Sequence, residues 1–230
     1  MADLNEHVLE VRYKPNPKVL DNRGSWAEVI SDFMDLPTWR IVENRIDIYD
    51  EKNGDRAFVG FRNAGFVVHN TPTKNYFPDK AVKFFRYLFT LKDFPKTPYV
   101  ERIGVRSKFC KEYKGSFDQL REKYTSNYLS LTEKAKNIIN SKLIDIGGPL
   151  NFADKYGNFN TMSGPMTDEQ LPQFFKKPED VPAVGLYFDI DYWLRPKKQV
   201  DEQEIVKNIR QFANSAWERF ESISKLILEE

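Results

Sequence analysis

The chain has 230 residues, of which 40% are hydrophobic and 14% are aromatic, enough to form a packed core. Its 35 basic residues nearly balance its 34 acidic ones, so the net charge of +1 disfavours a nucleic-acid or anionic-membrane partner. With two histidines and one cysteine, it has few residues for acid–base chemistry, metal binding or disulfides. The composition therefore favours binding over catalysis and predicts no cofactor.

The sequence carries no signal for export or membrane insertion. The first ten residues include acids and lack the basic and apolar regions of a signal peptide. No run reaches the roughly 18 apolar residues needed to cross a bilayer. A single cysteine, Cys110, gives no disulfide framework, and we expect it to be buried as a small apolar group. These features predict a cytoplasmic protein without membrane association.

The first part of the chain alternates strand and helix signals. Residues 7–13 alternate in polarity, which predicts a half-buried strand with His7 and Val11 on its buried face. Ser25 is expected to cap a helix that runs to about Leu36, with Glu28 at the capping-box position. The Asn53-Gly54 turn predicts a hairpin within a three-stranded antiparallel meander. The strands of this meander are expected at residues 39–49, 56–61 and 66–69, followed by a helix that Asp79 caps.

The middle of the chain continues with a strand at residues 99–109 and a helix that Ser116 caps and that runs to about Tyr128. In this strand, Ile103 and Val105 share one face and the basic residues share the other. The remaining predicted elements are a short helix at 133–141, strands at 143–152 and 156–162, a helix at 168–175 and a strand at 184–194.

The longest predicted element is a C-terminal amphipathic helix. Asp201 and Glu204 fit a capping box that opens it. Its apolar residues recur at spacings of three and four, which is typical of a helix lying across a sheet. The stripe is also long enough to extend past a small domain and contact a partner. It consists of Ile205, Ile209, Phe212, Ala216, Phe220, Ile223 and Ile227.

Strands outnumber helices and adjoin one another through short turns. This order predicts an α+β fold in which helices cover an antiparallel sheet mainly on one face. No low-complexity linker divides the chain, which favours one compact domain over residues 1–230. The order of elements also suggests two structurally related halves, residues 1–115 and 116–230.

Two groups of charged residues are candidate sites. Asp189 and Asp191 lie on one face of a predicted strand, at a spacing that could hold Mg²⁺ in a phosphodiester enzyme. Arg102, Arg106 and Lys108 form a basic row on another strand. If the two strands are neighbours, we expect cross-strand ion pairs; otherwise the row could grip a phosphate or carboxylate.

Two segments resemble a sporadically distributed family of prokaryotic proteins that has no assigned activity. They are Arg102-Ile103-Gly104-Val105-Arg106 and, before the C-terminal helix, Phe188-Asp189-Ile190-Asp191. The family pattern has leucine at the position of Val105 and an aromatic residue at that of Ser107. The resemblance implies the same order of elements over most of the chain. The family's patchy distribution implies a role among accessory or antiviral-defence genes.

The leading hypothesis is a non-enzymatic protein that binds another protein, or a second copy of itself, through the C-terminal helix. Phe212, Trp217 and Phe220 are the predicted contacts on that helix. One alternative is the metal-dependent enzyme that uses Asp189 and Asp191. Another is a sensor of a small anionic ligand, with an aromatic pocket between sheet and helices that is entered past the two arginines.

Overall fold

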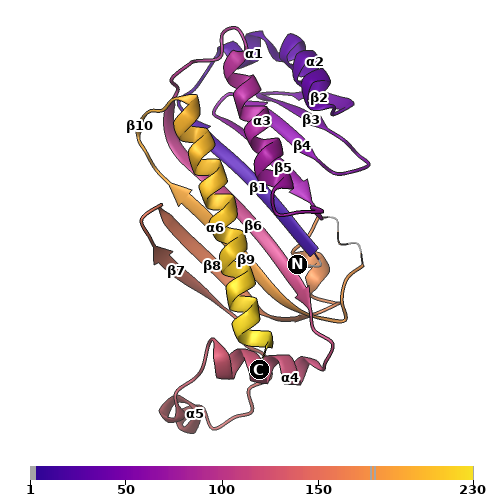
Figure 1. Ribbon diagram of the computed structural model, residues 1–230, viewed down its shortest axis with the longest axis vertical. Helices are drawn as coiled ribbons and strands as arrows, with labels where there is room; N and C mark the ends of the chain where they lie inside the picture. Colours follow the sequence, from indigo (N-terminus) through magenta and orange to yellow (C-terminus); the bar gives the residue numbers. More distant parts are fainter. Residues whose placement is uncertain (1–3, 177, 179, 230) are drawn as a thin grey trace.

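The computed structural model describes residues 4–176, 178 and 180–229, and it has the predicted α+β architecture. One large antiparallel sheet runs through the molecule, and the long helices lie on one side of it (Figure 1). The strands are β1 (Leu4–Tyr13), β2 (Thr38–Val42), β3 (Arg45–Tyr49), β4 (Arg56–Gly60), β5 (Asn63–His69), β6 (Tyr99–Glu112), β7 (Gly148–Ala153), β8 (Asn158–Thr167), β9 (Val184–Leu194) and β10 (Lys198–Gln199). The helices are α1 (Lys18–Asp21), α2 (Arg23–Met34), α3 (Tyr76–Thr90), α4 (Phe117–Asn127), α5 (Glu133–Ile139), the 3₁₀ turn η1 (Leu171–Gln173) and α6 (Glu202–Leu228).

The sheet consists of two related halves that meet at its centre. The strand order is β2-β3-β4-β5-β1-β6-β9-β8-β7, with β10 paired to β6. In each half the first strand pairs with the last strand of its own meander, β1 with β5 and β6 with β9. Each half then ends in a helix, α3 or α6. The predicted boundary at residue 115 is therefore wrong, because β6 is the counterpart of β1 and opens the second half.

Strand register assigns each residue to one of two faces. Leu9 lies opposite Val105 in the β1–β6 pair, and both are fully buried beneath the helices. Their neighbours of the other parity point to the opposite side, as expected for pleated strands. We call that side the open face. On the central strands it comprises Glu6, Glu10 and Arg12 of β1, Arg102, Arg106 and Lys108 of β6, and Asp189, Asp191 and Trp193 of β9.

The helix side carries the main core. Helices α3 and α6 lie next to each other across the sheet, and α2 covers β2 and β3 (Figure 1). The core is rich in aromatic rings: His7 lies between Phe77 of α3 and Trp217 of α6, with ring centroids 5.0 and 5.8 Å away. The face of the first strand predicted to be buried is therefore confirmed. A smaller cluster, in which η1 covers Leu4, Cys110 and Tyr187, closes one end of the open face.

The C-terminal helix lies across the sheet with its apolar stripe facing inward. Phe212, Trp217 and Phe220 are 0%, 3% and 1% exposed. Phe220 stacks on Phe109 of β6 at 4.5 Å, and Phe212 stacks on Tyr192 of β9 at 5.5 Å. The hypothesis that these three residues contact a partner is therefore wrong, because the protein's own sheet occupies their face of the helix.

Several local predictions need correction. Ser25 does not cap α2; α2 follows α1 almost directly, and Asn22 flanks both helices. The single strand predicted at 39–49 is the hairpin β2–β3, whose turn at Glu43-Asn44 has no glycine or proline. The helix expected at 168–175 shrinks to η1, in which Pro172 lacks a backbone donor. Helix α3 begins at Tyr76, so Asp79 lies inside its first turn.

Other predicted signals are confirmed. Ser116 caps α4 with a complete capping box to Gln119. At the start of α6 the Asp201 side chain accepts the backbone N–H of Glu204, but the Glu204 carboxylate pairs with Lys198, so only half of the predicted capping box is present. Strand β9 has the predicted bounds. Among the described helices, none is both long and apolar enough to cross a membrane.

Because Phe220 of α6 packs on Phe109 of β6 and Phe188 of β9, we expect Phe220→Ala to lower the free energy of unfolding by about 3–5 kcal/mol. The control is Leu226→Ala, at an α6 position that is 56% exposed and should change stability by less than about 0.5 kcal/mol. Urea unfolding followed by circular dichroism measures both. Equal effects of the two variants would contradict the packing described for α6.

Candidate functional site

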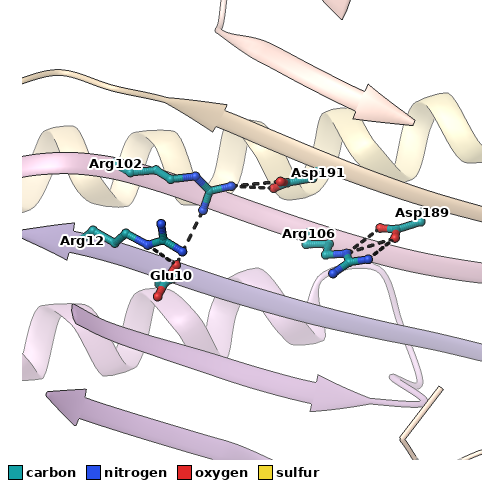
Figure 2. A network of polar contacts seen from close by, with 6 residues as sticks. All are labelled: Glu10, Arg12, Arg102, Arg106, Asp189 and Asp191. Atoms are coloured by element: carbon teal, nitrogen blue, oxygen red, sulfur yellow. Dashed lines mark hydrogen bonds and ion pairs between the residues drawn. The ribbon is translucent and has the colours of Figure 1, made fainter. Parts of the chain in front are cut away.

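The open face carries ion pairs that join its three central strands. Arg102 of β6 binds both oxygens of Asp191 at 2.9 and 3.0 Å (Figure 2). Arg106 binds Asp189 through Nε at the same two distances and also through Nη2. In Figure 2 the helices lie behind these strands, so the ion pairs face away from the core. The structure thus brings the two arginines of the predicted basic row together with the predicted acidic pair as cross-strand partners, whereas Lys108 pairs with Glu6.

The pairs are diagonal, and Gly104 allows this arrangement. In register, Asp191 lies opposite Arg106, yet it bonds to Arg102, four residues along β6. The Arg102 guanidinium lies across Gly104, where the Cβ of any other residue would collide with it. From there, its other Nη atom reaches Glu10 of β1 at 3.8 Å, and Glu10 also pairs with Arg12. The glycine thus lets one arginine link β1 to β9.

A second group surrounds Glu6, whose side chain is almost fully buried. Lys108 donates to its carboxylate at 2.7 Å, His69 Nδ1 lies 3.3 Å away, and the Lys176 backbone N–H donates at 3.1 Å. Burial alone would raise the pKa of Glu6, but these three contacts outweigh it and lower the pKa to about 2. Lys108 also donates to the Phe174 carbonyl, so this group holds the segment after η1 against the sheet.

A third group lies on the outer strands of the first half, and the sequence analysis did not find it. Asp47 of β3 has a fully buried carboxylate that faces three arginines: Arg40 of β2, Arg45 of β3 and Arg56 of β4. Their nitrogens lie 3.4, 3.0 and 2.5 Å from its oxygens. Register places Asp47 on the open face, through Phe58, Gly65 and Glu10. The alternation Arg45-Ile46-Asp47 indicates from sequence that Arg45 and Asp47 share a face of a strand. The contact with Arg40 depends on the pairing of β2 with β3, which the sequence did not predict.

The charges at the centre of the open face compensate one another. Burial raises the pKa of Asp191, and Arg102 offsets part of that effect. Hydrogen bonding to Asp189 raises the pKa of Arg106 above its ordinary value, so this arginine stays charged. The oxygens of both carboxylates in the predicted metal pair therefore accept hydrogen bonds from guanidinium groups. Within the described residues, no group of three or more His, Cys, Asp or Glu side chains could hold a metal ion.

The remaining predicted residues fall elsewhere. Cys110 is a buried thiol in the small cluster under η1. Arg102 and Arg106 lie on the face away from the helices, so they do not flank any pocket between sheet and helices. That part of the ligand-sensor hypothesis is wrong. Phe212, Trp217 and Phe220 belong to the core on the other side of the sheet.

Comparison with known proteins adds no functional assignment. No protein-family model matches the chain, and neither does any curated protein.

The pKa of Glu6 is lower in the folded protein than in the unfolded chain, where it is near 4.5. The ionised Glu6 therefore stabilises the folded state fully at pH values above 4.5, and this contribution is lost as the pH falls toward 2. We expect Glu6→Gln to lower the free energy of unfolding by about 3 kcal/mol at pH 7 and by progressively less below pH 4.5. Denaturant unfolding of both proteins between pH 7 and pH 2 measures the difference.

Two comparisons make this measurement specific. His7 has a pKa lowered to about 3 by burial, so its own loss of stability between pH 6.5 and 3 occurs in both proteins and largely cancels. Glu101→Gln, at an exposed position of β6, is the matched control and should change stability little. A Glu6→Gln difference that stays constant from pH 7 to pH 2 would contradict the ionised, paired state of Glu6.

Proposed function

We propose that this chain is a non-enzymatic interaction protein that binds a partner protein through the open face of its sheet. The observation that carries the proposal is that none of the described α-helices covers this face, although it extends over both halves of the sheet; only the short turn η1 closes one end of it. Many antiparallel sheets have one face in solvent, so an uncovered face alone does not indicate a binding site. The residue types on the face therefore have to show whether it is suited to a partner.

The exposed arginines, tryptophan and methionine of the open face are residue types that protein interfaces favour, and its carboxylates serve as ion-pair partners of the arginines. Its cations are nearly all arginines, and Arg106 leaves 53% of its side chain exposed. Register adds Met162 of β8, which is 45% exposed and lies opposite Asp189, and Trp193, whose ring lies under the Arg195 guanidinium. Arginine, tryptophan and methionine are enriched at interfaces, whereas lysine and glutamate dominate ordinary solvated surfaces.

The charge arrangement favours a protein partner over a polyanion. Each arginine of the central pairs faces a carboxylate, so positive charge is compensated at the centre of the face. The Asp47 group at the outer strands is the exception, because three arginines surround one carboxylate there. Nucleic acid binding relies on an excess of cations against phosphates. A surface that alternates both signs instead suits a partner with the complementary mixture. The resemblance to a patchily distributed prokaryotic family supports an accessory or defence-linked setting for that partner.

Photo-crosslinking in the native host tests which side of the molecule the partner contacts. A photoreactive phenylalanine analogue at Met162 should give a specific adduct, whereas the same group at Leu226, which is at least as exposed but lies on α6, should give none. An adduct from Leu226 alone, or from neither position, would overturn the proposal.

A matched pair of arginine variants tests the energetics with the captured partner. We expect Arg106→Ala to weaken binding at least about tenfold. Arg210→Ala also removes an exposed, ion-paired arginine, but one on α6, and should leave affinity unchanged. Both arginines are half-exposed, but Arg106→Ala leaves the carboxylate of Asp189, 10% exposed, without its partner, so circular dichroism and urea unfolding establish that each variant is folded. Equal effects on affinity would argue against the open face as the contact surface.

A further inference from the structure

A groove of about 680 Å³ lies on the helix side of the sheet, beside α6 and above the outer strands of the second half. Its volume falls within the range of small-molecule sites. The lining includes Tyr128, Phe152, Tyr156, Phe159, Thr161 and Arg219. The groove is on the side of the sheet opposite the proposed partner surface.

The groove exists because the two halves are covered unequally. In the first half, α2 packs over both outer strands, β2 and β3. Its counterpart α4 packs on β8 nearer the strand's other end, where the Tyr124 hydroxyl meets Ser163. The uncovered end of β7 and the turn that leads to β8 carry aromatic rings: Phe152 is 43% exposed and Tyr156 is 38% exposed. This apolar surface faces solvent where the other half has a helix.

One wall of the groove is rigidly organised. The Arg219 guanidinium lies 4.5 Å above the Phe159 ring and is held there by Asp154 at 2.6 Å and by the Tyr192 hydroxyl. Asp154 in turn accepts two backbone N–H groups, from Tyr156 and Gly157. The side chain of Arg219 is thereby fixed before any ligand arrives, which reduces the entropy cost of binding.

The polar groups of the groove point to an uncharged ligand. Asp154 neutralises Arg219, and Glu218 balances Lys155, so the lining has no excess charge to match an ion. The hydroxyl of Thr161 is buried and has no hydrogen-bond partner among the described residues. Leaving such a group unpaired costs free energy, and a ligand that offers a donor or acceptor would recover it. Ser215, Gln211 and Ser222 add further hydrogen-bonding groups at the rim.

From these features we infer that the groove binds a neutral, planar heteroaromatic ring of the size of a nucleobase or a nicotinamide. The ring packs on the exposed surface of Phe152 and Tyr156, and its polar edge bonds to the Thr161 hydroxyl. This site acts independently of the open face, so its test does not depend on the proposed partner.

Amide chemical-shift mapping with adenine, uracil and nicotinamide tests the inference. At least one probe should bind with a dissociation constant below about 1 mM and shift amides within residues 152–161 and 211–223. Nicotinate has the same ring as nicotinamide but carries a charge, and it should bind more weakly. The inference is overturned if no probe binds, if the shifts map elsewhere, or if nicotinate binds more tightly than nicotinamide.

Substitutions of the residues that line the groove distinguish specific binding from non-specific hydrophobic binding. Phe152→Ala should lower the affinity for the probe by about tenfold or more. The nearly isosteric Thr161→Val should lower it by about fivefold. Trp39→Ala is the matched control, because this tryptophan is as exposed as Phe152 but lies on the opposite edge of the sheet. Circular dichroism confirms that each variant is folded. Unchanged affinity in Phe152→Ala would contradict the site.

Discussion

The antiparallel pairing of β1 with β6 is the constraint on which the rest of the structure depends. It joins the two halves into one sheet, and its register decides which residues meet the helices. With His7 opposite Ser107 and Leu9 opposite Val105, the apolar set faces α3 and α6. A slip of one residue between the two strands would turn one of them over, placing either Glu6 or Lys108 under the helices and exposing that strand's core residues to solvent. The hydrophobic alternation of β1 and β6 therefore specifies the register strongly, and together with the β6–β9 register it positions the ion pairs between the central strands.

The same register explains why the open face tolerates so many charges. A carboxylate such as that of Glu6, almost fully buried in the sheet surface, would be costly without partners. Antiparallel neighbours deliver those partners from strands that are distant in sequence: Lys108 lies opposite Glu6, and Arg102 reaches both flanking strands across Gly104. Each exposed pair contributes little to stability, about 0–1 kcal/mol, because half of a side chain such as that of Arg106 remains in solvent. The arrangement therefore adds specificity of shape and charge to the surface more than it adds stability.

The sequence predicted those parts of the fold that local periodicity governs. The faces of β1 and β6, the bounds of β9 and the caps at Ser116 and Asp201 follow from patterns within each segment. The pairing of Arg102 and Arg106 with the two aspartates could be predicted only on the condition that β6 and β9 are neighbours. A local sequence pattern does not show which strands are neighbours, because strand pairing joins segments that are distant in sequence. The stripe of α6 was ambiguous for a similar reason: periodicity shows which face of a helix is apolar, and tertiary structure decides what covers it. The groove beside α6 left no signal in the sequence, since it arises from where α4 packs relative to α2.

Alternation along β8 and β9 places two different chemistries on opposite sides of one layer. Thr161 and Tyr192 face the helix side, where the groove lies, while Met162 and Asp191 face the open side. Successive residues of a strand point to opposite faces, so the two proposed surfaces share the same backbone but no side chain. A substitution at Met162 or Arg106 therefore leaves the lining of the groove unchanged, and one at Thr161 or Phe152 leaves the ion pairs unchanged. A protein whose partner contact and ligand contact occupy the two faces of one sheet can lose either function by point mutation without losing the other.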